Sequence, residues 1–161
     1  MSRRAEIKQL ALAVNDTLTV YIATHDAIFR EAATFKSFLR NLVGRGVPMA
    51  KLQEDAERLL PLWDAIDERI VTFRQSSYSS LSNGERSFVD ILSRYVTAVR
   101  ETVTALVDRQ RFLNQGSMGG SRNPMTWQAL QQKERRYKEL MTLVKYSCDH
   151  VRTRALHDTG S

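Results

Sequence analysis

Apolar residues recur every seven positions through the first part of this chain. One heptad position is occupied by Ile7, Val14, Tyr21, Ile28, Phe35 and Leu42. A second set four residues on, from Ala11 to Leu39, widens this column into the apolar stripe of a helix that packs along one side. Gly44 then supplies the backbone freedom that commonly ends a helix. The pattern predicts a helix over about residues 4–43.

Three more columns with the same period begin at Leu52, Leu92 and Leu130. They predict further helices over about residues 48–75, 83–114 and 125–156. Four helices with short connections favour an up-down-up-down bundle, and a period of seven favours left-handed packing at about 20°. We therefore predict an all-α four-helix bundle that forms a single domain over residues 1–161.

Local signals refine the predicted helices. Pro61 removes one backbone hydrogen bond while the heptad phase continues, which predicts a kink in helix 48–75. Ser82 and Glu85 have the spacing of a capping box at the start of helix 83–114, which we expect to be the most deeply buried. Because helix 4–43 is longer than helix 48–75, we expect its first turns around Ile7 and Leu10 to overhang.

Composition limits the function classes. The 161 residues include 24 Lys and Arg against 18 Asp and Glu, a net charge of +6, which permits binding to nucleic acid, anionic lipid or an acidic protein. Cys148 is the only cysteine, so no intrachain disulfide can form. No run of apolar residues is long enough for a membrane span, and no secretory signal begins the sequence. We predict a cytoplasmic protein.

Histidines do not indicate a metal site. A di-iron bundle needs a Glu three residues before each ligating His, and neither His25, His150 nor His157 has one. A zinc site with a single cysteine is equally unsupported. We predict no metal and no cofactor, and we expect His25 to be a core side chain of helix 4–43.

Arg152 and His157 have Arg-x4-His spacing. This spacing resembles the motif of HEPN-type ribonucleases, which are helical domains whose Arg and His act on RNA across a dimer. The resemblance implies a metal-independent ribonuclease with Arg152 and His157 as catalytic residues.

Basic residues gather along helix 125–156, where Lys138, Lys145 and Arg152 share one heptad position, with Lys133, Arg135 and Arg136 nearby. We expect Glu134 to pair with Lys138 four residues on. Such a face predicts contacts to nucleic-acid phosphates that do not depend on sequence. The alternative is a solvated surface without a ligand.

In an up-down bundle the first and third connections lie at the same end. This would bring Arg45 near Arg122 at two helix N-termini, whose free N–H groups can hold an anion. No Walker A sequence is present, so nucleotide hydrolysis is not predicted. Apolar residues at this end favour the docking of a partner protein: Val47, Met49, Met118, Met125 and Trp127.

Three functions follow from these patterns. The leading one is a non-enzymatic interaction protein, either an adaptor, a chaperone or an assembly subunit, that binds another protein or a second copy of itself. The first alternative is a sequence-independent nucleic-acid-binding subunit that uses the basic face. The second alternative is the HEPN-like ribonuclease.

Overall fold

The computed structural model describes residues 2–32, 49–117 and 127–157, and within these it describes the side chains of 2–29, 49–115 and 128–145. The helices are α1 (Arg3–Ala32), α3 (Met49–Glu57), α4 (Leu59–Ser77), α5 (Asn83–Ser117) and α6 (Trp127–His157), with a 3-10 turn, η1, at Tyr78–Ser80. The described residues contain no strand.

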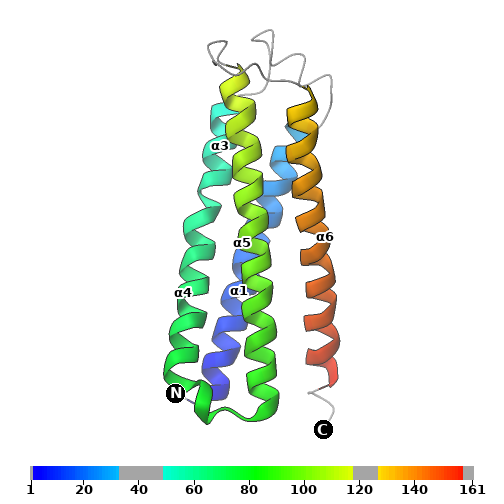
Figure 1. The fold of residues 1–161 in the computed structure, drawn as a ribbon. Coiled ribbons are helices and arrows are strands. Elements are labelled where there is room, and N and C mark those ends of the chain that lie inside the picture. Colours follow the sequence, from blue (N-terminus) through cyan, green and yellow to red (C-terminus); the bar gives the residue numbers. More distant parts are fainter. Residues whose placement is uncertain (1, 33–48, 118–126, 158–161) are drawn as a thin grey trace.

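The helices lie side by side as a bundle in which α3 and α4 together form one of the four rods (Figure 1). The ends of α1 and α5 lie at the upper end of this view, together with the starts of α3 and α6, and η1 lies at the lower end. The prediction of an all-α four-helix bundle is confirmed. Left-handed heptad packing stays a prediction.

The core centres on α5, which contacts α1, α3, α4 and α6. Its apolar face is closed to solvent, with Val89, Val96, Val99, Val103 and Leu106 all at 0% exposure. Each such side chain contributes about 1.5–3 kcal/mol through burial. The expectation that this helix is the most deeply buried is confirmed. In contrast, α1 packs mainly on α4, and α6 packs mainly on α5.

Helix 48–75 is divided into α3 and α4 near Pro61, where the sequence predicted a single kinked helix. The break falls at Arg58, between α3 and α4, where the backbone keeps the helical angles φ −63° and ψ −20°. The N–H of Arg58 still donates to the Glu54 carbonyl at 3.0 Å. Pro61 has no N–H to offer the carbonyl of Glu57 four residues earlier, so the regular pattern stops there and resumes in α4.

The capping box is confirmed at the start of α5. The Ser82 N–H donates to Glu85 Oε2 at 2.9 Å, and the Glu85 N–H donates to Ser82 Oγ at 3.3 Å. These backbone N–H groups have no partner within the helix, so the two side chains satisfy them.

The predicted overhang of the first helix is wrong, because Ile7 and Leu10 are 8% and 6% exposed. The second rod is longer than predicted, since α4 reaches Ser77 and η1 extends it. The Arg3 guanidinium donates to the Ser80 carbonyl at 3.2 Å, which ties the start of α1 to this turn. The first turns of α1 are therefore covered.

Candidate functional site

The predicted sites at the loop end fall mostly outside the described residues. These are Arg45 and Arg122 for the anion site, and Val47, Met118 and Met125 for the docking surface. Trp127 begins α6, but its side chain is not among those described. Met49 is only 4% exposed and belongs to the core, so its assignment as an exposed docking residue is wrong.

Arg152 and His157 both belong to α6, and their side chains lie outside the described set. The ribonuclease hypothesis stays a prediction.

Four cations on the described part of the basic face have no acidic partner among the described side chains. The side chains of Arg135, Arg136, Lys138 and Lys145 are exposed. Among the described residues, the ion pairs within 4.0 Å include none of these four. Lys133 is half-buried, with its Nζ 5.7 Å from the centroid of the Phe112 ring. Arg152 lies outside the described side chains.

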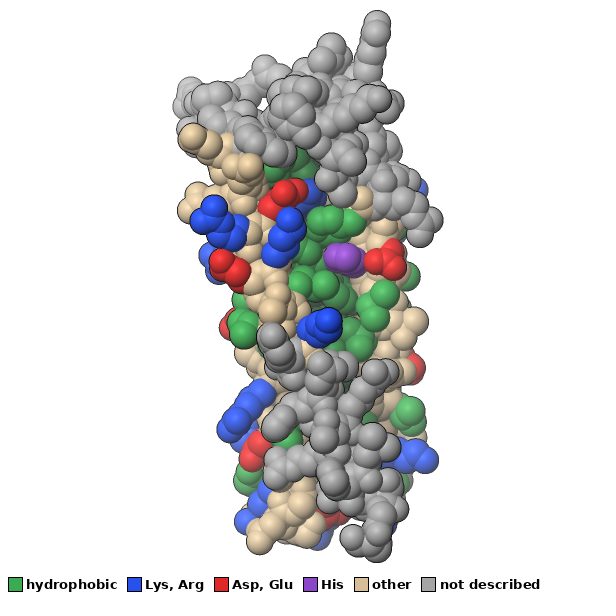
Figure 2. Space-filling view, turned by 90° about the vertical axis from the view of Figure 1, so that its right-hand side faces the viewer, with side chains coloured by type: hydrophobic (Ala, Val, Ile, Leu, Met, Phe, Trp, Pro, Cys, Tyr) green, Lys and Arg blue, Asp and Glu red, His purple; other side chains and the backbone are tan. Residues whose placement is uncertain are grey.

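Glu134 does not pair with Lys138, so that expectation is wrong. Its Oε1 instead accepts a hydrogen bond of 2.8 Å from Nη2 of Arg109 on α5. Glu134 is still 23% exposed, and with Glu139 it lines a shallow hollow of about 470 Å³ on this face beside Arg135 and Lys138. Figure 2 faces this side and shows its basic side chains interspersed with acidic and neutral ones.

Arg109 is a buried cation, with only 1% of its surface exposed. It was not predicted from the sequence. Besides Glu134, it contacts the Gln110 amide oxygen at 3.4 Å and the face of Phe29, whose centroid is 4.9 Å from the guanidinium carbon. The sequence carried a signal for it. Arg109 follows Leu106 by three residues, a spacing that places both on one face of the helix.

Aromatic side chains join α1 to α6. The hydroxyls of Tyr21 and Tyr137 share a hydrogen bond of 2.7 Å, and Tyr21 also donates to the Met141 sulfur. His25 stacks on Phe29 and Tyr137, with ring centroids 4.5 and 5.9 Å away. The His25 side chain is 23% exposed, so it lies at the edge of the core rather than inside it.

The side chains of this aromatic cluster pack against one another and offer no reactive group. Burial raises the pKa of Tyr21 to about 12 and also raises the pKa of Tyr137. Both hydroxyls therefore keep their protons near neutral pH and supply no base. Across the part of the chain that the structure describes, no three His, Cys, Asp or Glu side chains gather as a metal site would require.

Two separate hollows lie between α1 and the α3–α4 rod. The upper one has a volume of about 430 Å³, and the buried side chains Ile28 and Leu59 are in its lining. Val20 from α1 and Leu62 from α4 also line it, and they are 46% and 42% exposed. Large apolar side chains thus remain open to solvent beside a concave surface.

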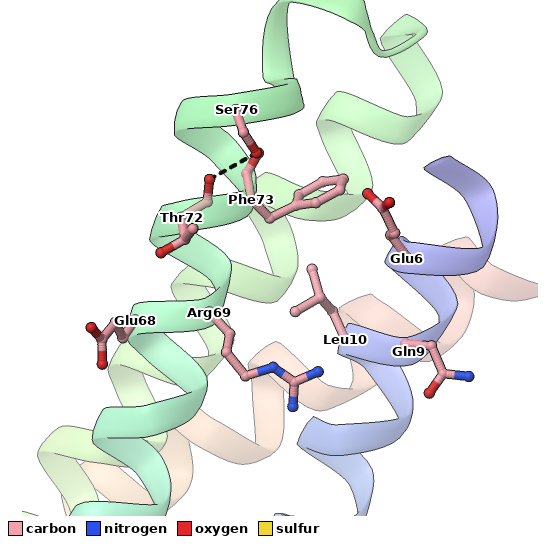
Figure 3. A pocket seen from close by; sticks show the side chains of 8 residues that line it. All are labelled: Glu6, Gln9, Leu10, Glu68, Arg69, Thr72, Phe73 and Ser76. Carbon is pink, nitrogen blue, oxygen red and sulfur yellow. Dashed lines mark hydrogen bonds between the residues drawn. The ribbon is translucent and has the colours of Figure 1, made fainter. Parts of the chain in front are cut away.

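The lower hollow has a volume of about 400 Å³ and is lined by charged side chains (Figure 3). Glu6, Glu68 and Arg69 line it together with Leu10 and Phe73. Figure 3 shows the Arg69 side chain reaching from α4 toward α1. Arg69 takes part in none of the ion pairs found among the described side chains.

Both hollows lie on the same side of the bundle. Leu62 and Arg69 are seven residues apart on α4, and Glu6 and Val20 are fourteen apart on α1, so each pair shares one helix face. We call the two hollows together the α1–α4 groove. The sequence indicated which residues are apolar, but not that these would border an open groove.

Comparison with known proteins gives no relative for this chain: no family model, no curated protein and no solved structure matches it. None of the described helices combines the length and the apolar character that crossing a bilayer requires.

Proposed function

We propose that this protein is a non-enzymatic interaction protein, an adaptor, chaperone or assembly subunit, that binds a partner protein in the α1–α4 groove. One observation carries the proposal: Val20 and Leu62 leave large apolar surfaces exposed on opposite walls of a hollow. Contiguous exposed apolar surface marks interaction sites in soluble proteins.

The proposal is tested by placing a photo-crosslinking amino acid at Val20 in cells that produce the protein. We expect one adduct of defined mass, whose partner peptide mass spectrometry identifies. The same amino acid at Leu143, which is 57% exposed on α6, serves as the control and should give no such adduct. Equal labelling from both positions, or none from Val20, would refute the assignment of the groove.

A second candidate function is sequence-independent binding of nucleic acid by α6. It is favoured by the exposed cations Arg135, Arg136, Lys138 and Lys145, which have no acidic partner among the described residues. Cations of this kind contact phosphates and release counterions on binding.

Fluorescence anisotropy with single- and double-stranded oligonucleotides tests this candidate. We expect log K to fall linearly with log salt, with a slope of about −0.9 for each duplex phosphate neutralised. The double variant Lys138→Glu, Lys145→Glu should lose binding. The matched control Lys51→Glu, Arg94→Glu makes the same charge change at exposed positions of α3 and α5 and should retain more binding. Equal loss in both variants would remove the α6 face from consideration.

A further inference from the structure

We infer that the partner of the α1–α4 groove is a second copy of this chain, bound about a two-fold axis that passes beside Leu62. This inference rests on the proposed function and names its partner. It is drawn from the pattern of charge along the groove and from the spacing of that charge around Leu62.

Opposite charges stand at equal distances from Leu62 on one side of the rod. Asp55 precedes Leu62 by seven residues and Arg69 follows it by seven, and all three line the groove. Seven residues are two helical turns, or about 10 Å along the axis, and Arg58 keeps helical backbone angles where α3 meets α4 between Asp55 and Leu62. A two-fold axis at Leu62 exchanges the two directions along the helix, so it brings Arg69 opposite Asp55 of the partner subunit.

Both charged groups are available for such a pair. Arg69 is exposed and has no ion pair among the described side chains. Asp55 has one such contact, 3.7 Å from Nη1 of Arg58. That guanidinium already donates its shorter hydrogen bond to Glu54, so Asp55 is weakly held. A direct charge-assisted bond to Arg69 of the partner subunit would satisfy both groups.

The mixed signs of the groove favour this occupant over a strongly charged one. Its lining contains the acids Glu6, Asp55 and Glu68 and the bases Arg58 and Arg69. A polyanion would be repelled by the acidic side chains, and a polycation would be repelled by the basic ones. Each contact between like charges lowers the affinity. A second copy presents the same alternating pattern in reverse and places Leu62 against Leu62 of the partner subunit. An isologous contact of this kind is self-complementary by symmetry.

Light scattering and sedimentation of the full chain over a range of concentrations test the inference. We expect a particle of twice the chain mass. Leu62→Glu should give a folded monomer, because it places two like charges at the axis. Leu143→Glu adds the same charge to an exposed leucine of α6 and should leave the dimer intact. Circular dichroism checks that each variant keeps its helices.

Charge exchange provides the sharper test. Asp55→Arg and Arg69→Asp should each weaken the dimer on the order of a hundredfold, since each breaks two symmetric pairs worth about tenfold apiece. The double variant Asp55→Arg, Arg69→Asp restores opposite charges across the axis and should return to within about threefold of the original affinity. Failure of the double variant to recover while it remains folded would overturn the predicted pairing.

The outcomes separate this inference from the proposed function. A wild-type chain that stays monomeric at the highest soluble concentration overturns the second-copy inference. So does a dimer that survives both Leu62→Glu and the two single charge reversals. If Val20 then still crosslinks to a different protein, the proposed function stands with another partner. If Val20 gives no adduct, both the second-copy inference and the proposed function are refuted.

Discussion

Replacing Glu134 by leucine is expected to destabilise the bundle by about 3 kcal/mol. The loss arises from Arg109, which is 1% exposed and would keep its charge without a carboxylate to balance it. Breaking a buried ion pair by removing one partner typically costs about 3–5 kcal/mol, and we take the lower end because Glu134 is 23% exposed. Urea unfolding followed by circular dichroism measures the difference.

A second substitution should recover most of that loss. The double variant Arg109→Met, Glu134→Leu removes both charges and leaves an apolar side chain beside Phe29. As a control, Glu54→Gln breaks an exposed pair with Arg58 and should cost no more than about 0.5 kcal/mol. If Glu134→Leu cost no more than Glu54→Gln, the Arg109–Glu134 pair would contribute little to stability.

The helices could be predicted from the sequence because their signals are local. The seven-residue columns and the Ser82–Glu85 spacing depend on neighbours along the chain, and these same neighbours form the helix and its cap. The extent of the second rod could not be read this way. Four serines and a tyrosine follow Gln75 over residues 76–80, and this composition favoured a loop, whereas the structure continues α4 to Ser77 and adds η1.

The polar residues of the core show where side-chain type misleads. Gln110 is 0% exposed and continues the column of Val89, Val96 and Val103, seven residues after the last. Arg109 beside it follows Leu106 by three. Helix position therefore determined burial at both sites, although glutamine and arginine usually lie on the surface. A heptad count that kept polar residues in their columns would have placed both in the core.

Candidate sites were harder to predict because they depend on contacts between helices. Glu134 and Lys138 have a favourable local spacing, but Arg109, which is distant in sequence, takes the carboxylate. Likewise, the exposure of Val20 and Leu62 depends on how far α1 and α4 separate, and no periodicity records that distance. The groove depends on how the helices are arranged in space, which the sequence pattern does not specify.

Trp63→Ala is expected to destabilise the protein by about 3–5 kcal/mol, since the indole is 0% exposed and its removal leaves a large cavity. Trp63→Phe should cost clearly less, for two reasons. The phenyl ring fills much of the space. The indole Nε1 has no hydrogen-bond partner among the residues that the structure describes, so its loss removes an unsatisfied buried donor. Thermal unfolding of both variants measures the two effects. If the phenylalanine variant were as unstable as the alanine variant, the indole N–H would have to bind an acceptor such as a buried water, and the core around Trp63 would be more polar than its apolar neighbours indicate.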